Sequence, residues 1–133
     1  DGLRFGGYIL SDAPGGRPEL ILIATGSEVD LIVAAAEKLQ AFNIAVRTVS
    51  MPSWELFEAQ TQEYRDEVLP PGVSARISVE AGISQGWCRY TGDKGVIISI
   101  DHFGASAPGP VLLREFGFTA ENICERALAL LKK

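Results

Sequence analysis

Apolar runs and helical patterns alternate along the chain, and the apolar runs predict five strands. The expected strands cover residues 8–10, 19–25, 45–51, 75–81 and 95–101. The second run, ELILIAT, is almost continuously apolar, which is typical of a strand covered on both faces. In the fourth, Ile77 and Val79 are expected to face one side of the sheet, and Arg76, Ser78 and Glu80 the other.

Apolar residues recur at helical spacing between and after these runs. Helices are expected at 27–42, 53–69, 110–116 and 119–131, and a short one is expected to carry Trp87 and Tyr90. Ser27 suits the start of the first helix as a capping residue, and Asn43 suits its end.

Strands that alternate with helices favour right-handed crossovers and a parallel sheet between helical layers. The segment between residues 10 and 19 is too short for such a crossover, so the first two strands are expected to run antiparallel. We therefore predict a three-layer α/β/α domain with a mostly parallel, about five-stranded mixed sheet. We assign residues 8–133 to this domain and residues 1–7, DGLRFGG, to the remnant of a linker.

Composition narrows the partners and the compartment. The 133 residues carry a net charge of −5, which disfavours nucleic acid and anionic membrane surfaces, because both require a basic face. No apolar run approaches the roughly 20 residues that a membrane span needs. The two cysteines are too few for a disulfide framework and fit the reducing cytoplasm. A single histidine and no CxxC pair give no recognisable zinc site.

Polar and aromatic residues follow the predicted strand ends, and ligands of open α/β sheets bind at the carboxyl ends of the strands. We interpret these residues as a candidate interdomain or ligand edge. They are Ser27, Trp54, Glu80, Gly82, Trp87, Asp101, His102 and Phe103. The two tryptophans fit a partner surface and packing over the sheet end about equally well. For Glu80, we expect that it anchors local backbone amides or reaches a neighbouring domain.

Two sharper interpretations of this edge are weak. A phosphate site at the Gly26 turn conflicts with Glu28 and Asp30, whose negative charges would repel an anion. A thiolate–imidazole pair of Cys88 and His102, oriented by Asp101, lacks any recognisable nucleophile signature. A cysteine is more often a small buried apolar residue, and this applies most strongly to Cys124 in the last helix. The residues alone contain no catalytic set.

Eight motifs occur in a fixed order along the chain: GGYIL, LIATGSEV, VRTVSMPSWELFEAQ, YRDEVLP, ARISVEAG, GWCRYTGDKG, SIDHFGASAP and EFGFTAENI. Together they resemble the C-terminal domain of bacterial-type transketolase over residues 6–131. The resemblance implies a parent enzyme that transfers a two-carbon ketol group from a ketose phosphate to an aldose phosphate. Thiamine diphosphate and Mg or Ca would be bound by the other domains of that enzyme, across a homodimer interface.

The resemblance carries no catalytic, cofactor-binding or metal-binding residue onto this chain. Gly92, Asp93 and Lys94, with Asn122, only superficially match the metal motif of the family, because Lys94 replaces a glycine. The fragment is therefore expected to be inactive alone, and to contact the other domains of the same enzyme and the second subunit of a homodimer. The alternative is a domain that binds a small anion or regulatory metabolite at the carboxyl edge of the sheet. The sugar specificity of the parent stays open.

Overall fold

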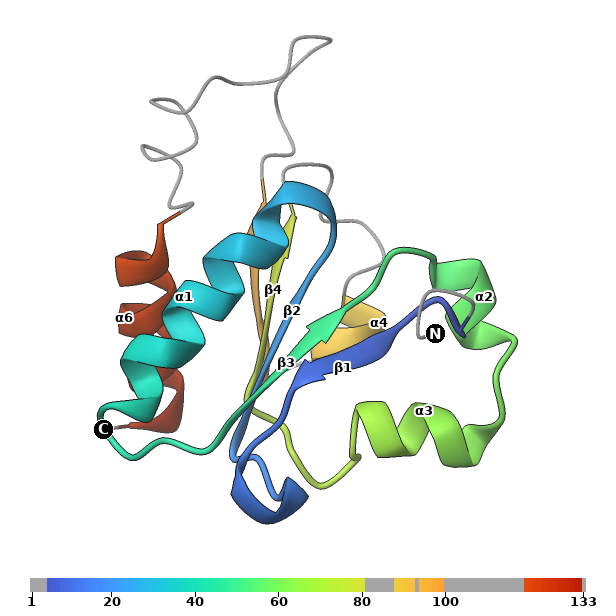
Figure 1. The fold of residues 1–133 in the computed structure, drawn as a ribbon, viewed down its shortest axis with the longest axis horizontal. Helices are drawn as coiled ribbons and strands as arrows, with labels where there is room; N and C mark the ends of the chain where they lie inside the picture. The colour runs from blue at the N-terminus through green and yellow to red at the C-terminus, as the bar shows by residue number, and fades with distance from the viewer. Residues whose placement is uncertain (1–4, 81–87, 93, 100–118, 133) are drawn as a thin grey trace, which may run out of the picture.

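The fold is a five-stranded sheet between two helical layers (Figure 1). The computed structural model describes residues 5–80, 88–92, 94–99 and 119–132. The strands are β1 (Tyr8–Ser11), β2 (Leu20–Ala24), β3 (Val46–Ser50), β4 (Arg76–Glu80) and β5 (Val96–Ser99). Their order is β1-β3-β2-β4-β5, and only β1 is antiparallel to its neighbour. The predicted fold class is confirmed.

The position of β1 refines the prediction for the first two strands. Its direction opposite to β2 is confirmed, but β3 lies between the two. The connection after β1, with a turn of 3₁₀ helix at Pro14–Gly16, passes β3 before β2 begins. Antiparallel direction follows from loop length, whereas the choice of neighbour depends on β3, which comes later in the chain.

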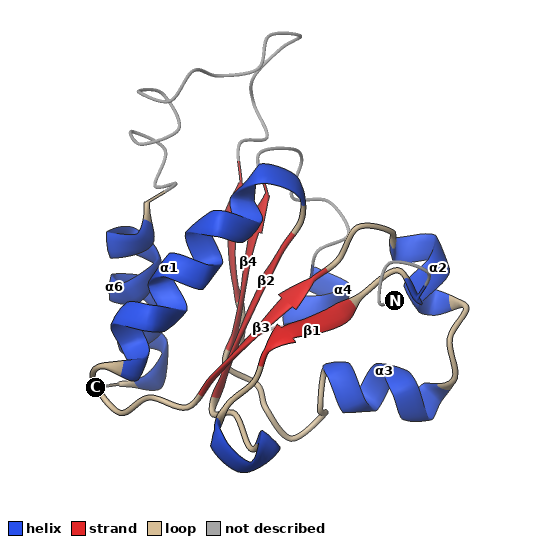
Figure 2. Cartoon of the chain, in the orientation of Figure 1, coloured by secondary structure: helices blue, strands red, loops and turns tan. Residues whose placement is uncertain are grey.

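Helices cover both faces of the sheet (Figure 2). They are α1 (Val29–Gln40), α2 (Trp54–Glu58), α3 (Gln62–Val68), α4 (Cys88–Thr91) and α6 (Ala120–Leu131). Figure 1 shows α1 and α6 on one side of the sheet and α2, α3 and α4 on the other. The predicted helix at 110–116 lies outside the described residues.

The segment predicted as one helix at 53–69 is two helices, because it contains two capping residues. The Ser53 hydroxyl accepts a hydrogen bond from the Leu56 amide and starts α2. The Thr61 hydroxyl accepts one from the Tyr64 amide and starts α3. The cap at Thr61 bonds an amide at the start of α3 that a preceding turn of helix would otherwise bond. A separate helix can therefore begin there, and the chain turns between α2 and α3.

The end of α1 confirms the role predicted for Asn43. This residue has φ 62°, and its amide donates to the Gln40 carbonyl at 2.9 Å. The Ile44 amide donates to the Leu39 carbonyl at 3.2 Å, which completes a Schellman motif. Ile44 and Leu39 belong to the same buried cluster, so the motif also returns the chain to the core.

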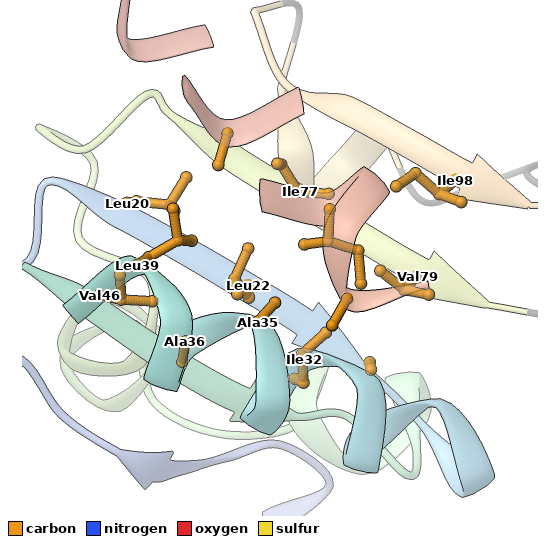
Figure 3. Close-up of a cluster of buried hydrophobic side chains, with 14 of the residues drawn as sticks. Leu20, Leu22, Ile32, Ala35, Ala36, Leu39, Val46, Ile77, Val79 and Ile98 are labelled. Carbon is orange, nitrogen blue, oxygen red and sulfur yellow. The ribbon is translucent and has the colours of Figure 1, made fainter. Parts of the chain in front are cut away.

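The core consists of two clusters, one on each face of the sheet. The cluster under α1 and α6, which we call the α1 face, is built from aliphatic side chains (Figure 3). The cluster under the three short helices, which we call the α3 face, contains Ile21, Ile23, Val49, Met51, Phe57, Val68, Leu69 and Tyr90. Residues of β2 alternate between the two clusters and are all buried, which explains its continuous apolar run.

Residues before β1 pack against α2 and α3. The Ser53 amide donates to the Gly6 carbonyl at 3.0 Å, and the Tyr64 hydroxyl donates to the Gly7 carbonyl at 2.7 Å. Gly6 has φ +79°, and a Cβ there would overlap the Ser53 carbonyl oxygen and the Phe57 amide. Phe5 to Gly7 are therefore packed against the domain, and the assignment of residues 1–7 to the remnant of a linker stays a prediction.

Candidate functional site

The carboxyl ends of β2 to β5 lie at one edge of the sheet, as the parallel register requires. Ala24 pairs with Ser50 on one side and with Val79 on the other, and Glu80 pairs with Ser99. Three candidate residues are therefore brought to this edge: Ser27 after β2, Trp54 after β3, and Glu80 at the end of β4. The other five candidates, Gly82, Trp87, Asp101, His102 and Phe103, lie outside the described residues and stay predictions.

The turn after β2 differs from its prediction. Gly26, with φ +63°, leads into a turn of 3₁₀ helix at Gly26–Glu28, and the residue in the capping position of α1 is Glu28. Ser27 therefore lies inside a helical turn, and its prediction as the capping residue was wrong. Helical geometry starts early here because the glycine turns the chain directly after the strand.

Two carboxylates lie at this edge, which disfavours an anionic ligand there. The Glu28 side chain is buried, with 6% of its surface exposed, and it follows β2. Glu80 is half-buried at the end of the neighbouring β4. Both residues have interaction partners. A phosphate or carboxylate ligand would meet two negative charges, so the small-anion alternative at this edge receives no support from the described geometry.

Trp54 packs on the aromatic part of the α3 face. Its ring lies 5.5 Å from the ring of Tyr90, centroid to centroid, in an edge-to-face arrangement. Tyr90 in turn lies 5.9 Å from Phe57. Trp54 is half-buried, so the packing interpretation holds for one part of its ring while another part remains at the surface.

Glu80 continues the alternation that the sequence predicted for β4. Ile77 and Val79 lie in the cluster of the α1 face, as expected. Arg76, on the other face, donates hydrogen bonds to backbone carbonyls of the α3–β4 connection and of α4. The register thus places Glu80 on the side of the short helices, at the edge where the strand ends.

Sequence reasoning missed a buried arginine, Arg47, in the middle of β3. Its side chain is 4% exposed, and its Nε donates to Asp12 Oδ1 at 2.8 Å. Nη1 donates to the Glu67 carbonyl at 2.7 Å and to the Val68 carbonyl at 3.2 Å. The hydrogen bond from Arg47 holds the pKa of Asp12 below its ordinary value. An arginine inside the apolar run VRTVS was the available signal, although its partner 35 residues earlier was not predictable.

Arg76 is the second arginine whose role the sequence did not indicate. Its Nε donates to the Val73 carbonyl at 2.9 Å, and Nη1 donates to the Tyr90 carbonyl at 2.7 Å. Nη2 donates to the carbonyls of Pro70 at 2.7 Å and Leu69 at 3.2 Å. Burial lowers the pKa of Arg76. These bonds join the end of α3, the following connection and α4.

A comparison with known families decides the identity of the domain. The family model described as transketolase-like TK C-terminal domain matches residues 6–119. The chain belongs to the transketolase C-terminal domain family. The resemblance found in the sequence motifs is confirmed.

Individual transketolases match nearly the whole chain. The transketolase of Geobacillus stearothermophilus is 53% identical over 133 residues, which is 100% of this chain and 20% of that protein. The transketolase of Mycobacterium tuberculosis is 56% identical over 135 residues, covering 96% of this chain and 19% of that protein. The solved transketolase structure from Leishmania mexicana superposes with a TM-score of 0.87 at 44% identity, covering 98% of this chain and 18% of that one. The chain spans about a fifth of the length of these curated relatives.

In the described part of this transketolase C-terminal domain, the acidic side chains form no metal site, and Cys124 packs against the core. Among the described residues, no group of three His, Cys, Asp or Glu side chains could hold a metal ion, and no helix is long and apolar enough to cross a membrane. Cys124 is half-buried beside the α1 face, and its Sγ donates to the Ala35 carbonyl at 3.6 Å. Burial raises the pKa of the Cys124 thiol, which suits the core role predicted for it.

Proposed function

We propose that this chain supports the assembly of a transketolase and leaves the chemistry to the rest of the enzyme. The observation that carries the proposal is the match to the C-terminal domain family by a chain that spans about 20% of the length of its relatives. The parent enzyme would act in the cytoplasm and transfer a two-carbon ketol group from a ketose phosphate to an aldose phosphate. Thiamine diphosphate with Mg or Ca would be bound by its other domains.

The partners in this proposal are the other domains of the same enzyme and the second subunit of a homodimer. Support comes from the surface near the carboxyl edge. On α2, Trp54 is half-buried and Leu56 is 46% exposed, so one short helix presents two large apolar side chains. Glu80 lies at the same edge. A mixed apolar and charged surface of this kind is typical of contacts between domains of one chain.

The first test asks whether the chain binds the cofactor. Calorimetric titration of the 133-residue chain with thiamine diphosphate and Mg²⁺ should give no binding heat, and an assay of ketol transfer should give no product. Binding of the cofactor by this chain would contradict the proposal.

The second test separates assembly from catalysis in full-length transketolase. Glu80→Gln should weaken the dimer, measured by sedimentation at decreasing concentration, and leave kcat of the assembled enzyme nearly unchanged. Glu121→Gln is the matched control, because the Glu121 side chain is 71% exposed on α6 and its ion pair with Lys38 lies at the surface. A fall in kcat with an intact dimer would count against the assembly role.

A further inference from the structure

A cavity of about 460 Å³ lies between α3, α4 and the amino-terminal end of β4. Its volume falls in the range of small-molecule sites. It is separate from the carboxyl edge, because the strand residue that lines it, Arg76, is the first of β4. Apolar surface is provided by Leu69, Pro71 and Val73.

Among the described residues that line this cavity, the charged side chains leave a positive balance. Arg65 Nη1 lies 3.3 Å from Glu58 Oε1, so this pair is internally neutral. The same glutamate also accepts a hydrogen bond from the Tyr90 hydroxyl at 3.0 Å. Two cations, Arg76 and Lys94, remain against one carboxylate, Asp66. The described residues give neither cation an ion pair, in a chain whose net charge is −5.

Arg76 is held in place before any ligand arrives. Four carbonyl oxygens fix its guanidinium group, which prevents it from swinging out to solvent. These neutral acceptors satisfy hydrogen bonds but do not compensate the full charge, since the carbonyl ends of short helices carry only partial negative charge. Burial away from water also disfavours the charged form of Arg76, and this lowers its pKa. An anion beside it would offset that cost.

We propose that this cavity binds a small organic anion, with its carboxylate or phosphate against Arg76 and Lys94. The apolar part of the anion would lie on Leu69, Pro71 and Val73. This inference goes beyond the assembly role and is independent of it, because the site is formed by this chain alone. Loss of the ligand site would leave the assembly proposal standing, and the reverse also holds.

The test compares anions with a neutral analogue of the same shape. Benzoate, phenyl phosphate and benzamide are titrated into the ¹⁵N-labelled chain, and the amide signals of Thr91, Gly92 and Lys94 are followed. We expect both anions to shift these signals with saturable curves, and benzamide to bind at least about tenfold more weakly, which corresponds to roughly 1.4 kcal/mol. Equal affinity for benzoate and benzamide, or shifts that map to other parts of the chain, would overturn the proposal.

Variants separate a specific site from general attraction to positive charge. Lys94→Gln should weaken benzoate binding about two- to fivefold, the range of an exposed charge pair. The matched control, Lys38→Gln, removes the same charge from α1 and should leave the affinity unchanged. Equal weakening by both variants would overturn the proposal.

A third variant fills the site without touching the arginine. Arg76→Gln removes four hydrogen bonds and tests stability as much as binding, so it is not decisive. Ser74 lines the cavity and is exposed, and Ser74→Trp should fill the cavity and abolish binding in a folded protein. Unchanged benzoate affinity in folded Ser74→Trp would place the anion elsewhere and contradict the inference.

Discussion

The two faces of the sheet are stabilised in different ways. On the α1 face, two helices of 12 residues each cover an aliphatic cluster. On the α3 face, helices of 5, 7 and 4 residues cover a cluster that includes aromatic rings, and two arginines donate to backbone carbonyls around it. Long helices satisfy most of their own carbonyls, whereas short ones leave a large share unpaired. On the α3 face, donors from the strands bond such carbonyls: Arg47, which is buried, and Arg76, which is half-buried.

The largest expected effect tests whether the α1 face depends on packing alone. Ile32 is 0% exposed in the α1 cluster (Figure 3), and Ile32→Ala should lower the free energy of unfolding by about 2–5 kcal/mol. Because no charge is involved, the loss should be the same from pH 3 to pH 8. Urea denaturation at several pH values measures it. Val33→Ala, at a half-buried position of the same helix, should cost less, and equal costs would show that the face is not tightly packed.

A smaller effect, with a pH dependence, is expected on the α3 face. Asp12→Asn removes the carboxylate that Arg47 pairs with, and should lower the free energy of unfolding at pH 7 by about 1–2 kcal/mol, since Asp12 is partly exposed. The pKa of Asp12 is lowered in the folded state from its ordinary 3.8. Its contribution is therefore complete above pH 3.8 and is lost as the pH falls through the lower folded value.

Urea denaturation of Asp12→Asn and the native chain between pH 2 and pH 7 should show that their free energies of unfolding converge at low pH. Glu121→Gln provides the control, because it breaks the exposed pair with Lys38 and should change stability by less than about 1 kcal/mol. A constant difference between Asp12→Asn and the native chain down to pH 2 would show that the ion pair is not what stabilises this face.

The smallest expected effect is a gain in stability. Ser78 lies on β4 with 0% exposure, and its hydroxyl has no hydrogen-bond partner among the described residues. Ser78→Ala should therefore raise the free energy of unfolding by up to about 1 kcal/mol. Thr48→Val is the contrasting variant. The Thr48 hydroxyl accepts a hydrogen bond from the Ser11 amide at 3.0 Å, so its removal should lower the free energy of unfolding. Thermal unfolding of both variants checks the pair, and a loss in Ser78→Ala would mean that its hydroxyl is bonded.

Hydrophobic periodicity predicted the elements that depend on local pattern. The five strands and the end of α1 at Asn43 follow from such patterns, and so does the α/β fold class. The strand-end rule also placed Trp54 and Glu80 correctly at the carboxyl edge. Local pattern failed where two signals competed: Ser27 is a good capping residue, but the glycine before it starts the helical turn earlier.

Other features depend on residues far apart in the sequence. Arg47 meets Asp12 across 35 positions, and the choice of β3 as the neighbour of β1 depends on a strand made later. The cavity beside Arg76 forms only when α3, α4 and β4 come together. Periodicity carries no information on such contacts, because it describes which side of an element is buried and not what covers it.

The reversed direction of β1 also decides where the chain is tethered. β1 begins at the carboxyl edge, where Tyr8 lies opposite Ser50, the last residue of β3. The residues before β1 lie beside the start of α2, where the Ser53 amide donates to the Gly6 carbonyl, whereas β3 and β2 separate β1 from Glu80 on β4. A short tether keeps two surfaces at an effective concentration on the order of millimolar. In the proposed assembly role, contacts too weak to join separate molecules would then be sufficient for the edge to orient a neighbouring domain.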